Sequence, residues 1–183
     1  DSWGQPTIWW QLLKDQLGFT VNAPYTLDDM TADAVGLLDA VGYQDAHVIG
    51  FSMGGMIAQQ VAAQYPQRVL SLTSVMSTTF AKHLPPPTKA ANDALTSFAS
   101  GDAAEQRSQA ILDRGFYPES MPRQLMAIFK TGDRSAEVKT IAVKTLVIHG
   151  EDDGLIPPLH GEHTAELIKN SEIVIFPGMG HNV

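Results

Sequence analysis

A serine, Ser52, lies between glycines in a short stretch of the chain that would expose its hydroxyl. Residues 50–54 read G-F-S-M-G, the pattern G-x-S-x-G, between an apolar run and a run of small, helix-favouring residues. A serine at a sharp strand-to-helix turn projects its hydroxyl away from the backbone, and flanking glycines let neighbouring chain approach closely. N–H groups at the start of the helix suit a developing oxyanion. An ordinary turn serine would fit a lone motif, but this context predicts that Ser52 is a nucleophile.

A serine nucleophile works with a general base, normally a histidine that a carboxylate holds in one tautomer. The chain supplies both groups after later apolar runs. Asp153 follows the run that ends at His149-Gly150, and His181 follows the run 173–176. Because the carboxyl ends of parallel strands meet at one edge of a sheet, we expect both side chains near Ser52. The chain order Ser, Asp, His is one of those in which such triads occur.

Other carboxylates and histidines are weaker candidates for these roles. Glu151 and Asp152 are alternatives to Asp153 as the acid, and are otherwise solvated loop charges. His47 precedes a predicted strand and is expected to face solvent or a loop. His149 ends a predicted strand, where it would support the turn that carries the acid.

The sequence gives little reason to expect a metal or a cofactor. His160 and His163 flank Glu162, but they lack the H-E-x-x-H spacing that places two imidazoles on one helical face, so we expect a solvated helix there. No G-x-G-x-x-G or phosphate-binding loop is present, and we therefore expect no nucleotide cofactor.

Strand and helix patterns alternate around the candidate residues. Such alternation implies a parallel sheet with right-handed crossovers, and therefore an α/β fold. All three tryptophans lie in the first ten residues, around a possible short helix at about 6–17. The other predicted elements are helices at about 26–42, 53–65 and 159–168 and strands at about 46–50, 69–76, 145–148 and 173–176.

The middle of the chain has a different character. It begins with the basic and proline-rich segment Lys82–Pro87 and continues with helical patterns that contain no strand candidate. We therefore predict three parts: an N-terminal part of the core, residues 1–76, a helical lid, residues 77–143, and a C-terminal part of the core, residues 144–183.

Composition limits the possible partners. The 183 residues include 12 Lys and Arg against 20 Asp and Glu, a formal net charge of −8, which disfavours binding to nucleic acid or an anionic membrane. No apolar run is long enough for a spanning helix, and the absence of cysteine excludes a disulfide framework. The chain starts at Asp1 without an initiator Met, so we expect it to be processed or part of a longer protein.

Three ordered motifs resemble those of serine α/β-hydrolases of the esterase and lipase superfamily. The nucleophile motif matches residues 50–54, the acid motif matches residues 150–157, and a terminal G-x-G-H matches residues 178–181. The resemblance implies a catalytic triad of Ser52, Asp153 and His181 and an oxyanion site that includes the backbone N–H of Met53. It covers about residues 25–183.

The resemblance also implies an activity. We expect a serine carboxylesterase that hydrolyses small to medium acyl esters through an acyl-enzyme, with a small-molecule ester as its partner. A non-catalytic, hydrolase-like ligand-binding domain and an inactive fragment are the alternatives. Carbon–carbon bond hydrolysis, peroxyacid formation and lactone opening are further reactions that the same triad supports in this fold.

The pattern lacks some elements of the family. Its early strands, with the loop that gives the first oxyanion donor, and its final helix are not found, so we expect a truncated α/β-hydrolase fold with a short, mostly parallel sheet, flanking helices and a helical lid. Without the first oxyanion donor we expect weak rather than zero activity. The strand before Ser52 would become an exposed apolar edge, which a homodimer contact or the Trp-rich start would cover.

Overall fold

The computed structural model describes residues 10–11, 13–14, 17–99 and 120–181. The chain divides into two compact units: residues 1–26 with 88–130, and residues 27–87 with 131–183. The second unit contains the sheet and every predicted site residue. The predicted lid, residues 77–143, stays a prediction, because its central residues 100–119 lie outside the described part of the chain, as do Trp3 and Trp9.

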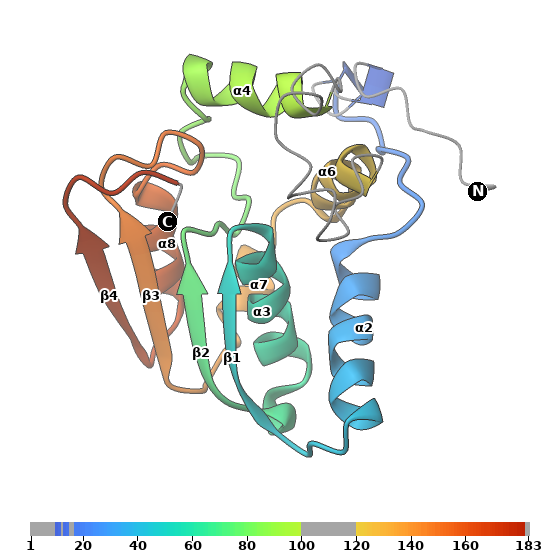
Figure 1. The fold of residues 1–183 in the computed structure, drawn as a ribbon, viewed down its shortest axis with the longest axis vertical. Helices are drawn as coiled ribbons and strands as arrows, with labels where there is room; N and C mark the ends of the chain where they lie inside the picture. Colours follow the sequence, from blue (N-terminus) through green and yellow to red (C-terminus); the bar gives the residue numbers. More distant parts are fainter. Residues whose placement is uncertain (1–9, 12, 15–16, 100–119, 182–183) are drawn as a thin grey trace, which may run out of the picture. The chain divides into compact units, whose positions relative to one another are not determined.

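The larger unit is built on a four-stranded sheet (Figure 1). Its strands lie in chain order and each neighbouring pair is parallel, which confirms the predicted fold class. Parallel neighbours require crossover connections, and these carry the helices. The strands are β1 (Ala46–Phe51), β2 (Val69–Val75), β3 (Thr145–Gly150) and β4 (Ser171–Phe176).

The three helices predicted at 26–42, 53–65 and 159–168 begin and end within a few residues of those bounds, whereas most of the helix predicted at about 6–17 lies outside the described residues. None of the described helices is long and apolar enough to cross a membrane. In the larger unit the helices are α2 (Leu27–Ala40), α3 (Met53–Gln64), the short 3-10 helix η1 (Pro66–Arg68), α7 (Ser135–Val138) and α8 (Leu159–Leu167). The other unit contains α4 (Lys89–Ala99) and most of α6 (Ser120–Thr131).

Helices α3 and α8 cover the same face of the sheet. Gln59 of α3 donates a hydrogen bond to the hydroxyl of Ser74, at 3.0 Å. Gly161 of α8 lies directly against the ring of His149. The register pairs Ser74 with Val147, two residues before His149, so the two helix contacts fall on one face. The main core cluster lies there and comprises Val35, Ala58, Val61, Ala62, Val69, Leu72, Val138, Ile141 and Ile168.

A buried arginine joins α3 to the segment that follows β2. Arg134 is only 2% exposed, and its guanidinium donates hydrogen bonds to the carbonyls of Met56 and Thr78 and to the side chain of Gln59. Its own N–H donates to the carbonyl of Thr79, at 2.9 Å. Burial lowers the pKa of Arg134 to about 10, against the opposing effect of nearby carboxylates. The group therefore stays charged at neutral pH and fixes the helix behind Ser52 to the next strand end.

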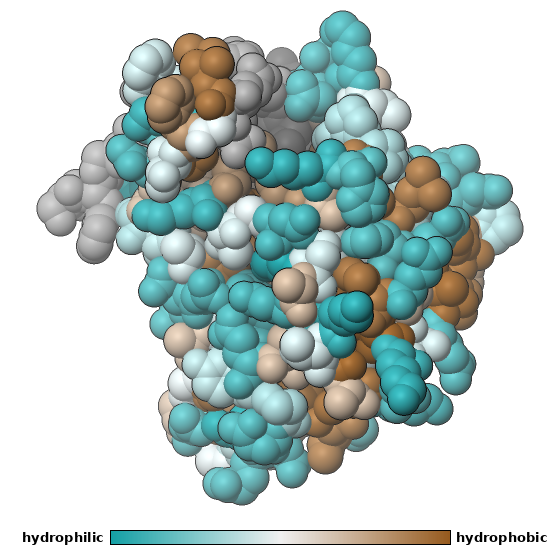
Figure 2. Space-filling view, turned by 180° about the vertical axis from the view of Figure 1, so that it is seen from behind, coloured by the Kyte–Doolittle hydropathy of each residue, from teal (hydrophilic) through white to brown (hydrophobic). Residues whose placement is uncertain are grey.

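The opposite face of the sheet carries exposed apolar side chains. Ile49 is 73% exposed and Phe51 is 40% exposed, both on β1, which among the described strands pairs only with β2. On β4, Val174 and Phe176 are also more than 40% exposed. Figure 2 views the molecule from behind, and there hydrophobic residues also gather along the side where β3, β4 and α8 lie. Parallel sheets normally have both faces covered, so the sheet face that carries Ile49 and Val174 is the part of the fold most open to a partner.

The homodimer expected through the β1 edge stays a prediction. Replacing Ile49 with Lys would place a charge on the edge strand and is expected to convert a dimer to a monomer, because a buried unpaired ammonium is costly. Light scattering coupled to size exclusion, over a range of concentrations, measures the mass. Leu37→Lys on α2, where the side chain is 63% exposed, is the matched control. A monomeric wild-type chain at every concentration would contradict the expectation.

Candidate active site

The turn between β1 and α3 holds Ser52 in a strained conformation. Its backbone has φ 53° and ψ −121°, a conformation that residues other than glycine rarely adopt. Such a conformation costs about 1–3 kcal/mol and persists only where surrounding structure enforces it. Here the N–H of Ser52 donates to the carbonyl of Val75 at 2.9 Å, and the carbonyl of Ser52 accepts the N–H groups of Gly55 and Met56. The hydroxyl is thereby turned out of the backbone at the end of β1.

Close backbone approaches explain the glycines around the serine. A Cβ on Gly50 would lie 2.1 Å from the carbonyl oxygen of Gly54, so only glycine fits there. A Cβ on Gly55 would lie 2.6 Å from Cβ of Ser77. Ser77 is buried, and its hydroxyl donates a hydrogen bond to the carbonyl of Ser52 at 2.9 Å. No local pattern points to Ser77, because its role depends on a contact with a distant turn.

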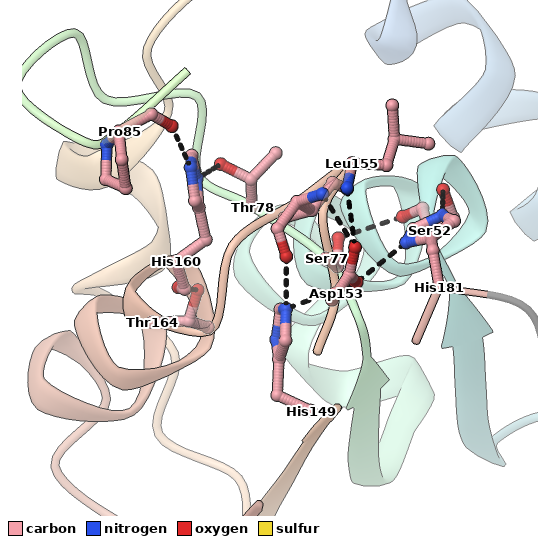
Figure 3. A network of polar contacts seen from close by, with 11 residues as sticks. Ser52, Ser77, Thr78, Pro85, His149, Asp153, Leu155, His160, Thr164 and His181 are labelled. Carbon is pink, nitrogen blue, oxygen red and sulfur yellow. Dashed lines mark hydrogen bonds and ion pairs between the residues drawn. The ribbon is translucent and has the colours of Figure 1, made fainter. Parts of the chain in front are cut away.

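His181 connects the serine to a carboxylate, as Figure 3 shows. Its Nε2 lies 3.0 Å from Oγ of Ser52, and its Nδ1 lies 2.7 Å from Oδ2 of Asp153. A carboxylate accepts a hydrogen bond, so Nδ1 carries a proton and Nε2 is free to accept the serine proton. The ring of Phe51 packs against the imidazole with centroids 5.2 Å apart. The structure thus brings together the three side chains named from the sequence.

Asp153 is held by the turn in which it lies. Its Oδ1 accepts the N–H groups of Leu155, at 2.9 Å, and Ile156, at 2.8 Å. Burial raises the pKa of this carboxyl, but its contacts with His149 and His181 and the N–H of Ile156 outweigh that effect and hold the pKa well below the ordinary 3.8. The carboxylate is therefore ionised at any pH near neutrality.

The competing acids lie elsewhere. Glu151 and Asp152 are exposed, whereas Asp153 is only 2% exposed and bonded to His181. The geometry therefore selects Asp153 among the three neighbouring acids as the partner of the histidine.

Backbone hydrogen bonds continue the sheet ladder past the strand ends and bring the loops together. The N–H of Met76 donates to Ile148, at 2.8 Å, which joins the ends of β2 and β3. The N–H of Asp152 donates to the carbonyl of Met179, at 3.0 Å, which joins the acid turn to the loop that carries the histidine. A Cβ on Gly150 would lie 2.2 Å from that same carbonyl oxygen, so glycine is required at the end of β3.

His160 is not on a solvated helix face as the sequence suggested. Its Nδ1 accepts the hydroxyl of Thr78 at 2.6 Å, and its Nε2 donates to the carbonyl of Pro85 at 2.9 Å. Burial lowers the pKa of His160, with further effects from His149, Asp153 and other neighbours. The side chain thus fixes the segment after β2 to α8. No group of three side chains suited to a metal ion occurs among the residues that the structure describes.

Comparison with known proteins gives a consistent result. A family model described as the alpha/beta hydrolase fold matches residues 4–116, more than half of the chain. The chain is 28% identical to 2-hydroxymuconate semialdehyde hydrolase from Pseudomonas sp. (strain CF600), over 93% of this chain and 69% of that protein. It is 25% identical to rhodomycin D methylesterase DnrP from Streptomyces peucetius, over 86% of this chain and 68% of that protein.

A solved structure agrees with the fold. A hydrolase from Pseudomonas aeruginosa superposes with a TM-score of 0.65 at 24% identity, over 88% of this chain and 68% of that one. Similarity at this level supports the arrangement of strands and helices, not a substrate.

Gly55→Ala tests the close packing behind the nucleophile. The added methyl group would collide with Ser77, so we expect the free energy of unfolding to fall by about 1–3 kcal/mol. Gly54→Ala is the matched control, because a Cβ there meets no atom within 4 Å. Alanine is also the better helix former, so the control should be neutral or slightly stabilising. Urea denaturation measures both variants, and equal stability of the two would contradict the packing argument.

His160→Asn tests the tether between α8 and the segment after β2. Because folding lowers the pKa of His160 below 6.5, the unfolded chain gains a proton first as the pH falls, and stability is lost from about pH 6.5 downward. Asn accepts the Thr78 hydroxyl without titrating. The unfolding free energy of His160→Asn should therefore decline less steeply below pH 6.5 than that of the wild type, by up to about 1.4 kcal/mol per pH unit. Urea titrations at several pH values measure the slopes, with exposed His47→Asn as the control. A slope equal to that of the wild type would refute this role.

Proposed function

The chain belongs to the α/β-hydrolase family, and on that premise we propose that it is a serine hydrolase that cleaves carboxylic esters through an acyl-enzyme. Its relatives include named hydrolases, which supports hydrolase activity. The observation that carries the ester proposal is the continuous hydrogen-bonded arrangement of Ser52, His181 and Asp153 at the carboxyl ends of three parallel strands. This arrangement of alcohol, imidazole and carboxylate is what acyl transfer through serine requires.

In the proposed reaction, Nε2 of His181 takes the proton of the Ser52 hydroxyl as Oγ attacks the ester carbonyl. Asp153 keeps the proton on Nδ1 and stabilises the imidazolium that forms. The tetrahedral intermediate collapses when the imidazolium gives its proton to the leaving alcohol, which leaves an acyl group on Ser52. Water, activated by the same imidazole, then releases the acid and restores the hydroxyl.

The backbone N–H of Met53 is the oxyanion donor in this proposal. Met53 is the first residue of α3, and N–H groups in a first helical turn lack an intrahelical acceptor. They also lie at the positive end of the helix dipole, so they favour negative charge on the carbonyl oxygen of the substrate. In this proposal, the strained turn at Ser52 brings the serine oxygen and the N–H of Met53 to the same side.

Small to medium acyl esters are the proposed substrates. The likeness to a protein named as a methylesterase supports an ester as the substrate class. Ser52 carries the acyl group and His181 moves the proton, so ester cleavage at Ser52 needs no cofactor in this proposal.

A second candidate reaction is hydrolysis of a 2-hydroxy-6-oxo acid. Relatives with names of this kind recur among the similar proteins, and one of them, from Paraburkholderia xenovorans, is named as a 2-hydroxy-6-oxononadienedioate/2-hydroxy-6-oxononatrienedioate hydrolase and is 30% identical over 93% of this chain. Rates on such an acid and on p-nitrophenyl acetate, measured side by side, distinguish the two candidates.

Ser52→Ala tests the nucleophile. We expect turnover of p-nitrophenyl acetate to fall by about 10⁴-fold or more, because no other group supplies the attacking oxygen. Covalent labelling by a fluorophosphonate, read by intact mass, should be lost with it. Ser71→Ala on β2 removes a hydroxyl that bonds His47 instead, and should leave both signals intact. Unchanged turnover in Ser52→Ala would refute Ser52 as the nucleophile. A wild-type chain that neither labels nor turns over ester would favour the non-catalytic binding domain.

A further inference from the structure

A second histidine contacts Asp153 from the side opposite His181 (Figure 3). His149 is the residue before the last of β3 and is completely buried. Completely buried histidines need partners for their ring nitrogens, so the contacts of this ring show what it does.

Among the residues that the structure describes, one nitrogen of the His149 ring has polar partners and the other has none. Nε2 lies 2.7 Å from the carbonyl oxygen of Ile156 and 3.5 Å from Oδ2 of Asp153. Nδ1 is buried without a hydrogen-bond partner among the described residues. Because a carbonyl and a carboxylate both accept hydrogen bonds, the ring proton lies on Nε2 and points between them.

The backbone of α8 fixes this ring from behind. A Cβ on Gly161 would lie 2.5 Å from Nδ1 and 3.0 Å from Cγ of His149, so the helix packs directly on the imidazole. A ring confined in this way cannot tilt toward α8. Its single N–H is therefore held at a fixed place beside the acid turn.

The contact falls on the oxygen that matters to the proposed reaction. Oδ2 of Asp153 is the atom that accepts the hydrogen bond from His181, whereas Oδ1 is occupied by backbone N–H groups of the turn. The two carboxylate oxygens are thus held by different groups, and His149 is the buried donor on the side of Oδ2. The same N–H also holds the carbonyl of Ile156, whose own N–H binds Oδ1.

We propose that His149 is a positioning residue that orients the carboxylate of Asp153 toward His181, through its buried Nε2–H and the support of Gly161. This inference rests on the proposed function, because it concerns the acid of the same triad. A histidine that served only to brace the loop would support folding but would leave the hydrogen bond between Asp153 and His181 unchanged once the protein had folded.

Two substitutions at the site distinguish these roles. His149→Leu fills the volume without a donor, and His149→Gln places an amide N–H near the position of Nε2. We expect His149→Leu to lower kcat for p-nitrophenyl acetate by about 10- to 100-fold with KM changed by less than about twofold, because a small misplacement of a catalytic group has such an effect. His149→Gln should recover most of the loss.

A spectroscopic measurement separates this inference from the proposed function. The proton on Nδ1 of His181, assigned by its absence in His181→Asn, reports the hydrogen bond to Asp153 by its low-field NMR signal in the intact chain. We expect His149→Leu to shift or broaden that signal, and His149→Gln to restore it. The signal does not depend on turnover, so it tests the positioning role even if Ser52 proves not to be a nucleophile.

Two more variants complete the test. Val147→Ala, on the same strand and face and 1% exposed, destabilises the core without touching the acid, so it should leave kcat and the NMR signal unchanged. Gly161→Ala pushes on the ring from α8 and should reproduce the shift seen in His149→Leu, which keeps the test valid if His149→Leu fails to fold. A His181 signal that is the same in wild type, His149→Leu and Gly161→Ala would overturn the proposal.

Discussion

The candidate site depends on one constraint of the fold: parallel strands present all their carboxyl ends at the same edge of the sheet. Ser52, Asp153 and His181 follow β1, β3 and β4, and Ser77 follows β2. Residues separated by more than a hundred positions in the chain therefore need only short loops to meet. Backbone hydrogen bonds continue from the strand ends into these loops and fix their relative positions. One example is the bond from the N–H of Asp152 to the carbonyl of Met179.

Strain at the nucleophile is balanced by contacts that no single residue provides. The backbone of Ser52 lies in an unfavourable region, yet its N–H and carbonyl are both bonded, and α3 behind it is fixed to the segment after β2 by the buried charge of Arg134. Nη1 and Nη2 of this guanidinium donate to the carbonyls of Met56 and Thr78, so the cation holds both carbonyls in place. The turn that carries Ser52 is thus supported from two directions.

The sequence predicted the fold because its signals are local. Alternating strands and helices, the G-x-S-x-G motif and the position of Asp153 and His181 after strands are all visible in short windows, and the family and fold are confirmed by the comparisons. The contact of Ser77 with Ser52 and the tether of His160 to Pro85 join residues 25 and 75 positions apart, so no periodicity could reveal them. His160 lies three residues before His163 on α8, and this pattern predicts a solvated helix face until the segment that covers His160 is placed.

The contacts of Asp153 determine whether its carboxylate can become protonated in the pH range of the proposed reaction. Asp153 loses solvation when buried, which alone would favour the neutral acid, but its contacts with His149, His181 and the N–H of Ile156 reverse the balance and lower its pKa. A carboxylate that stays ionised well below pH 3.8 does not itself titrate where a serine hydrolase works. The surroundings of Asp153 therefore act by orienting the carboxylate rather than by setting its charge. Through that orientation the buried imidazole of His149, beside Oδ2, affects His181 and hence the hydroxyl of Ser52.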